Sequence, residues 1–131
     1  MIGLDTNVLV RYIMQDEPSQ SAKATTIMES LEVDRPGFVG LVSIVELYWV
    51  LSSCYDLTSD QVRQALDLLL RTRQIVVDHA EQVLYALKVF EPGKADFADC
   101  LIERMAASAG CEQTMTFDVS AAKHAGMTLI R

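Results

Sequence analysis

Short apolar runs alternate with longer segments of helical periodicity along the whole chain. The apolar runs lie at residues 2–4, 38–40, 74–77, 114–117 and 127–130, and each predicts a strand. Between them, apolar residues recur at spacings of three and four, which predicts helices. This alternation predicts an α/β fold, a three-layer sandwich in which helices cover both faces of a central parallel sheet.

End residues place several of the predicted helices. Pro18 suits the first turn of a helix, Thr58 and Gln61 fit a capping box, and Asp78 is expected to cap the helix that follows it. Residues 41–55 are apolar on nearly all sides, which predicts a core helix. A further helix is expected over residues 95–109 and a short one up to about residue 125.

Composition indicates a soluble globular protein. The 131 residues are 50% hydrophobic and 22% charged, so we expect a single domain over residues 1–131 with its own core. No apolar stretch is long enough to span a membrane and no signal region opens the chain, so we expect a cytoplasmic location. Three cysteines without a CxxC pair indicate neither a disulfide framework nor a zinc site, and we interpret them as packing residues.

Two predicted strands end at a carboxylate that precedes a helix. Asp5 follows the first strand and Asp118 follows the fourth. Because the carboxyl ends of parallel strands share one edge of a sheet, the two acids are expected to lie close together if their strands are neighbours. The alternative for the first acid is that Asp5 or Thr6 caps the helix that follows.

Glu46 is the only charge in the apolar segment 41–55. An ionised carboxylate among apolar residues carries a desolvation penalty of several kcal/mol unless it is paired or bound to a metal, which favours a functional role. The alternative is a capping box formed by Ser43 and Glu46 at a helix start.

The helix predicted at residues 95–109 carries three acids on one face. Asp96, Asp99 and Glu103 fall within about 60° of one another, beside an apolar stripe through residues 101, 102, 105, 106 and 109. The alternative is an acidic first turn with Asp96 as the helix cap. Clustered carboxylates without a local Lys or Arg favour a divalent cation, and oxygen ligands suit Mg²⁺ or Mn²⁺. Such metal sites hydrolyse phosphodiesters, whereas motifs for a serine nucleophile, a phosphate loop or a dinucleotide site are absent.

Four segments, LDTNVLVRYI, SIVELYWVL, DFADCLIERMAASAGC and TMTFD, together resemble the PIN-domain family and, within it, VapC-type toxins. The resemblance covers essentially the whole chain. It implies a metal-dependent ribonuclease whose metal ligands and catalytic residues are Asp5, Glu46, Asp99 and Asp118. It also implies supporting roles for Asn7, for Thr116 of the T-x-D strand end, and for Asp96 as an outer ligand or a helix cap. Glu103 is a departure from the family pattern.

The resemblance further implies Mg²⁺ or Mn²⁺ as cofactor, a homodimer and inhibition by a cognate antitoxin protein. The net charge of −7 excludes a broad basic face for duplex nucleic acid, so we expect single-stranded or looped RNA, such as tRNA, as the substrate. Arg11 and Lys94 are the cations nearest to the acids in sequence. Two alternatives are a PIN-like domain that binds RNA or protein without cleavage, and a receiver-like signalling domain.

Overall fold

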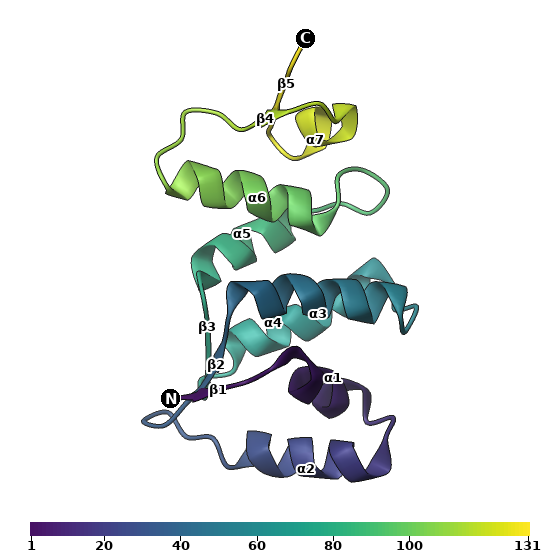
Figure 1. Ribbon diagram of the computed structural model, residues 1–131, viewed down its shortest axis with the longest axis vertical. Coiled ribbons are helices and arrows are strands. Elements are labelled where there is room, and N and C mark those ends of the chain that lie inside the picture. Colours follow the sequence, from purple (N-terminus) through teal and green to yellow (C-terminus); the bar gives the residue numbers. More distant parts are fainter. The chain divides into compact units, whose positions relative to one another are not determined.

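Every paired strand of the protein runs parallel to its neighbour, as the sequence predicts (Figure 1). The computed structural model describes residues 1–131, which divide into unit 1, Met1–Asp78, and unit 2, His79–Arg131. Each unit contains its own parallel strands and its own helices. The α/β class is therefore confirmed.

Unit 1 contains a three-stranded sheet in the order β1-β2-β3. Its elements are β1 (Ile2–Gly3), α1 (Thr6–Met14), α2 (Pro18–Glu29), β2 (Gly37–Val39), α3 (Leu41–Ser53), α4 (Ser59–Arg71) and β3 (Ile75–Val77). In the central strand, Gly37 lies opposite Ile2 on one side and Ile75 on the other. A Cβ atom at Gly37 would lie 2.7 Å from Cδ1 of Leu4, so glycine permits this close approach.

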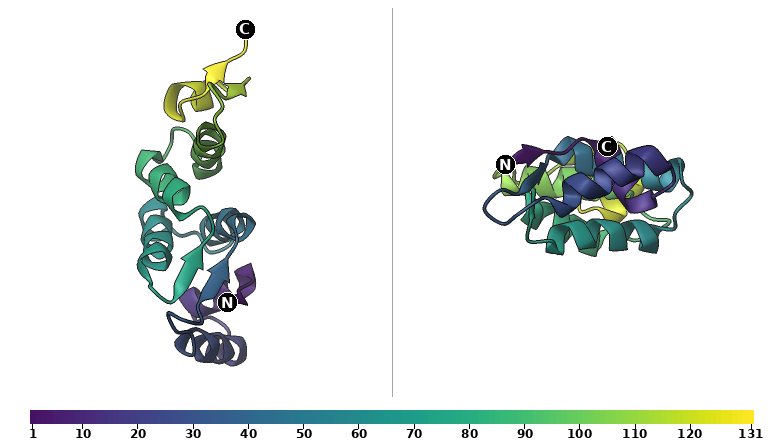
Figure 2. Two further views of the ribbon diagram at one scale, coloured as in Figure 1. Left: turned by 90° about the vertical axis from the view of Figure 1, so that its left-hand side faces the viewer. Right: turned by 90° about the horizontal axis from the view of Figure 1, so that it is seen from below.

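The core of unit 1 forms where its helices meet. Helix α1 packs on α2 and α3, and α4 packs on α3 and β3, beside which it lies in the left view of Figure 2. The fully buried side chains here include Leu9, Val39, Ile44, Leu47, Leu51, Val62 and Leu66. This core holds the carboxyl end of β1, and hence the start of α1, in place.

Two predicted helix starts in unit 1 are confirmed. Pro18 opens α2, where the side chain of Glu17 accepts hydrogen bonds from the backbone N–H groups of Ser19 and Gln20. Thr58 and Gln61 form the reciprocal capping box at the start of α4. Such caps satisfy N–H groups that would otherwise lack a partner in the first helical turn.

Helix α3 differs from the core helix that its composition predicts. Ile44, Leu47 and Leu51 are buried, but Val42 is 81% exposed and Trp49 is 61% exposed. The physical reason is that a helix buries only the faces that neighbouring elements cover, and the apolar character of the remaining face does not alter this. The interpretation of residues 41–55 as a helix buried all round is therefore wrong.

Unit 2 contains two packed helices followed by a small β-α-β unit. Its elements are α5 (Ala80–Val89), α6 (Phe97–Ser108), β4 (Met115–Thr116), α7 (Val119–His124) and β5 (Thr128–Leu129). Helices α5 and α6 pack together, and the rings of Phe90 and Phe97 meet edge to face at 6.5 Å between centroids. Strands β4 and β5 form a parallel pair connected by α7.

Two local predictions for unit 2 are wrong. The N-cap of α5 is His79, in the left-handed conformation with φ 51°, and not Asp78. The buried face of α6 comprises Phe97, Cys100 and Leu101, whereas Ile102 of the predicted apolar stripe is exposed, because α5 packs on one side of α6 only and the stripe extends beyond it.

The cysteines also depart from the prediction. All three are free thiols, but only Cys100 is buried, whereas Cys54 of unit 1 and Cys111 of unit 2 are exposed. The interpretation of Cys54 and Cys111 as packing residues is therefore wrong. No helix has the length and apolar character needed to span a membrane.

Candidate metal-binding carboxylates

Asp5 stands directly after β1, at the N-cap position of α1. Its backbone is extended, with φ −77° and ψ 157°, and its carbonyl oxygen accepts the N–H of Val8 at 3.1 Å. Its carboxylate is exposed and makes no capping hydrogen bond. The neighbouring Thr6 is buried, and its hydroxyl has no hydrogen-bond partner. Neither side chain caps the helix, so the Asp5 carboxylate is available to a ligand.

Glu46 lies in the second turn of α3. The N-cap of this helix is Gly40, so Ser43 already lies inside the helix and the alternative capping box of Ser43 with Glu46 is wrong. Glu46 is exposed, beside Val42 and Trp49, so it carries no large desolvation penalty and needs no partner on that ground. The carboxylate is open to solvent on the exposed face of α3.

Asp96 and Asp99 open helix α6 together. Asp96 is the N-cap, and its Oδ1 accepts the backbone N–H of Asp99 at 2.8 Å, so the helix-cap alternative for Asp96 is confirmed. Glu103, one turn further along, is 3.7 Å from the guanidinium of Arg104, which also lies over the ring of Tyr85. Glu103 therefore has a nearby cation, unlike the two aspartates.

Asp118 is held by two sets of hydrogen bonds at the end of β4. Its Oδ1 accepts the backbone N–H groups of Ser120 at 2.8 Å and Ala121 at 3.2 Å, which makes it the N-cap of α7. Its own N–H donates to Oγ1 of Thr116 at 3.0 Å. Oδ1 is thus occupied by the cap, whereas Oδ2 accepts no hydrogen bond and can bind a cation.

The pKa of the Asp99 carboxyl group is shifted by its surroundings in unit 2. Burial, the negative charge of Asp96, a carboxyl–carboxyl hydrogen bond with Asp96 and the negative charge of Asp118 raise the pKa of Asp99 above its ordinary value. Burial, followed by the negative charges of Asp99, Asp96 and Glu103, raises the pKa of the Cys100 thiol. Asp99 and Asp118 are therefore near enough to repel each other, and no Lys or Arg pairs with either.

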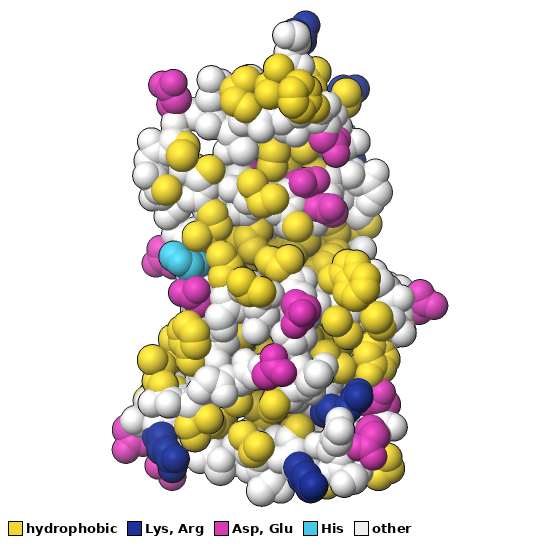
Figure 3. All heavy atoms as spheres, in the orientation of Figure 1, with side chains coloured by type: hydrophobic (Ala, Val, Ile, Leu, Met, Phe, Trp, Pro, Cys, Tyr) yellow, Lys and Arg dark blue, Asp and Glu magenta, His cyan; other side chains and the backbone are white.

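The donor set fits a divalent metal by its chemistry. Acidic side chains gather over the first half of α6, among hydrophobic atoms, in Figure 3. Neither unit contains a group of three or more His, Cys, Asp or Glu side chains that could hold a metal ion. The pair in unit 2 nevertheless offers oxygen ligands whose mutual repulsion a cation would relieve, and such ligands suit Mg²⁺ or Mn²⁺.

The fold and these carboxylates define an α/β protein with acidic residues at strand ends. A sequence model of the PIN domain matches residues 2–127, and the chain therefore belongs to the PIN domain family. PIN domains are typically metal-dependent nucleases. A comparison with curated proteins finds no match.

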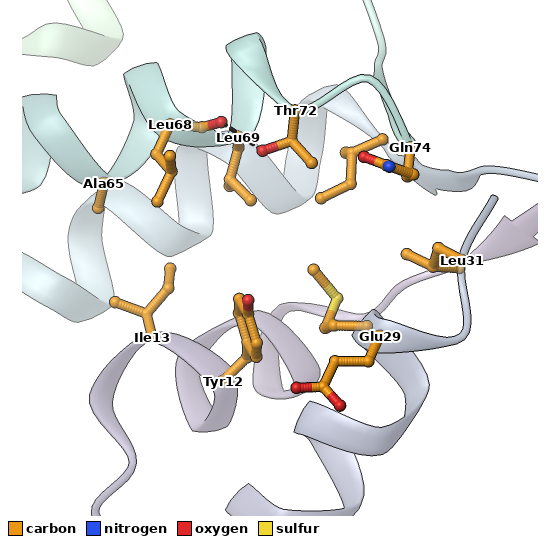
Figure 4. Close-up of a pocket in the computed structure, with 11 residues that line it drawn as sticks. Tyr12, Ile13, Glu29, Leu31, Ala65, Leu68, Leu69, Thr72 and Gln74 are labelled. Carbon is orange, nitrogen blue, oxygen red and sulfur yellow. Dashed lines mark hydrogen bonds between the residues drawn. The ribbon is translucent and has the colours of Figure 1, made fainter. Parts of the chain in front are cut away.

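An apolar cavity of unit 1 contains none of the predicted ligands. It has a volume of about 550 Å³ and lies between the α1–α2 pair and α4 (Figure 4). Its walls are mainly apolar, with Ile13, Leu68 and Leu69 pointing into it and Glu29 as its only acid. This cavity is therefore distinct from the candidate metal-binding residues.

The structure changes the interpretation of the two cations named from the sequence. Arg11 donates to Gln20 at 2.8 Å and to the hydroxyl of Tyr55 at 3.0 Å, and it is 3.4 Å from Asp16. Its guanidinium thus joins α1, α2 and the end of α3, and is not free for a substrate. Lys94, in contrast, lies in a hollow with other basic residues, which no pattern in the sequence indicated.

We expect replacement of Thr116 by Val to loosen the Asp118 turn. The substitution keeps the side-chain shape but removes the oxygen that accepts the Asp118 N–H, at a cost of about 1 kcal/mol in the free energy of unfolding. Cleavage should fall with it, because the Asp118 carboxylate loses its fixed position. Urea denaturation and nuclease assays test this, with Thr116→Ser, which keeps the hydroxyl, as the control that should resemble the wild type.

Proposed function

We propose that the protein is a metal-dependent ribonuclease in which Asp5, Glu46, Asp99 and Asp118 bind one or more Mg²⁺ or Mn²⁺ ions. The observation that carries the proposal is the placement of Asp99 in the first turn of α6 and of Asp118 after β4, without a basic partner for either, in a chain of the PIN family. The charge of Asp118 is among the causes that raise the pKa of Asp99, which agrees with this placement. A site built from unpaired carboxylates costs free energy in the empty protein, and binding of a cation recovers it.

Each residue has a distinct role in this proposal. When bound, the metal supplies an activated water and neutralises charge around the phosphate. Asp96 keeps Asp99 at the first turn of α6 by accepting its N–H, and Thr116 fixes the turn that presents Asp118. Asn7, exposed in the first turn of α1, would contact the substrate near Asp5.

The substrate is proposed to be single-stranded or looped RNA, such as tRNA. A chain with net charge −7 has few cations for gripping a duplex, so metal and a few local cations must provide the attraction to phosphate. We expect a hairpin RNA to be cleaved in Mn²⁺, and the matching duplex RNA, the matching DNA and all reactions in EDTA to show little cleavage. Preferential cleavage of the duplex, or equal activity in EDTA, would contradict the proposal.

We further propose that the protein is the toxin of a VapBC-type toxin–antitoxin pair, on the basis of the resemblance of its acidic segments to VapC-type proteins. Expression of the wild type in a bacterial host should stop growth, and Asp99→Asn should not. Equal growth at equal wild-type and variant protein levels would exclude the toxin role and favour a PIN-like domain that binds without cleaving.

Two protein partners belong to this proposal. A cognate antitoxin would place an Arg or Lys against the carboxylates, since a guanidinium pairs well with them, and the apolar cavity of Figure 4 offers a place for its hydrophobic side chains. A second copy of the chain would form a homodimer, as the resemblance to VapC-type proteins implies.

A further inference from the structure

Unit 2 gathers basic side chains in one polar hollow of about 370 Å³. This basic hollow is lined by Lys88, Val89, Glu91, Lys94, Lys123 and His124. The residues come from three segments: the last turn of α5, the loop before α6, and the last turn of α7. Three of the eleven Lys and Arg residues of an acidic chain thus converge on one hollow.

The hollow keeps an excess of positive charge. Its only acid is Glu91, and Oε2 of Glu91 is 2.7 Å from the ammonium of Lys94. Lys88 and Lys123 form no ion pair, so their charges remain available. Lysines in the last turn of a helix are stabilised by the helix dipole, which accounts for each position alone. The helix dipole does not explain why Lys88 and Lys123 converge with Lys94 on one hollow, where like charges repel.

The basic hollow shares its supporting elements with the acidic residues of unit 2. Lys94 precedes Asp96, the cap of α6, by two residues. Helix α7 begins after Asp118 and carries Lys123 and His124 in its last turn, about 8 Å further along the helix axis. A nucleic-acid strand whose scissile phosphate lies at the acids therefore has further phosphates within reach of the hollow.

We propose that the basic hollow binds a backbone phosphate of the RNA next to the one that is cleaved, and this inference rests on the proposed ribonuclease function. Lys88 and Lys123 supply the charge, His124 adds a hydrogen-bond donor, and Glu91 holds Lys94 in position. The lining offers only Val89 as an apolar surface, which suits a phosphate better than the side chains of an acidic peptide. Contacts of this kind grip the backbone and do not read sequence.

The test compares two double variants that change the net charge equally. Lys88→Gln with Lys123→Gln removes the free lysines of the hollow, and Arg35→Gln with Arg73→Gln removes two exposed cations of unit 1 that form no ion pair. Binding of a labelled hairpin RNA is measured by fluorescence anisotropy in EDTA at several salt concentrations. Thermal melting confirms that both proteins are folded, and the KM for the same RNA is measured in Mn²⁺.

We expect the lysine variant to bind RNA roughly 10-fold more weakly than the wild type at low salt. The slope of log Kd against log salt should be smaller by about 1 for each lysine removed, and the KM for the same RNA should be higher. The arginine variant should resemble the wild type. Equal Kd and slope for the two variants, beside a wild type that cleaves RNA in Mn²⁺, would overturn the inference. The inference would also be overturned if the lysine variant bound a labelled oligo-aspartate peptide more weakly than the wild type does but bound the RNA equally well. A wild type that does not cleave RNA at all would instead overturn the proposed function.

Discussion

Replacement of Asp99 by Asn should abolish RNA cleavage and leave the metal-free protein as stable as the wild type, or more stable. Cleavage should fall at least about 100-fold, because loss of a direct ligand should cost no less than loss of a residue that supports one. Stability should not fall, because the substitution removes a negative charge from beside Asp96 and Asp118. Cleavage rates in Mn²⁺ and melting temperatures in EDTA measure the two effects.

The direction of the pKa shift of Asp99 determines how the stability gain of Asp99→Asn should change with pH. The folded state raises the pKa of Asp99 above 3.8, so it binds that proton more tightly than the unfolded state does. The stabilising contribution is complete below pH 3.8 and is lost as the pH rises through the raised pKa. Any stability gain of Asp99→Asn should thus be present at pH 7 and shrink on acidification.

A matched control and a contradicting result complete the Asp99 experiment. Glu112→Gln removes the same charge from an exposed position in unit 2 and should change neither cleavage nor the pH dependence. A fall of more than about 3 °C in the melting temperature of the metal-free Asp99→Asn protein at pH 7 would show that Asp99 is a structural residue of α6.

Replacement of Phe97 by Ala should have the opposite effect to that of Asp99→Asn: the free energy of unfolding should fall, and cleavage should fall only as a consequence. Phe97 is fully buried in the first turn of α6 and packs against Phe90, so its removal should cost about 3–5 kcal/mol. Cleavage should then fall only as far as the protein unfolds. Urea denaturation gives the free energy of unfolding, and cleavage is compared at temperatures below and above the new midpoint.

Ile102→Ala is the control for the Phe97 variant. Ile102 lies on the same helix but is 54% exposed, so its replacement should change stability by no more than about 0.5 kcal/mol. If Phe97→Ala were as stable as Ile102→Ala, the packing of α5 on α6 would not support the helix that carries Asp99, and this description of unit 2 would be wrong.

The sequence predicts the local order of strand, acid and helix correctly at both Asp5 and Asp118. Each prediction rests on neighbours in the chain: an apolar run that must form a strand, then a residue that begins a helix. The capping box of Thr58 and Gln61 is of the same kind. Short-range patterns of this sort carry enough information because the interacting groups lie within a few residues.

Features that depend on which faces meet are not visible in the sequence. Hydropathy shows that α3 is apolar, but it does not show that Val42, Glu46 and Trp49 lie on an exposed face. The basic hollow likewise requires the ends of α5 and α7 to come together, although Lys88 and Lys123 are far apart in the chain. The same limit applies to the hydrogen bond between Arg11 and Tyr55, because these two residues are distant in sequence.

Titration of Mn²⁺, followed by the electron paramagnetic resonance signal of the free ion, tests most directly whether the four carboxylates bind metal. The wild type should remove Mn²⁺ from solution at stoichiometric protein concentration. Asp5→Asn, Glu46→Gln, Asp99→Asn and Asp118→Asn should each weaken this binding at least about 10-fold, while Glu112→Gln should not. Mn²⁺ binding of equal strength in the wild type and all four variants would contradict a metal site built from these residues.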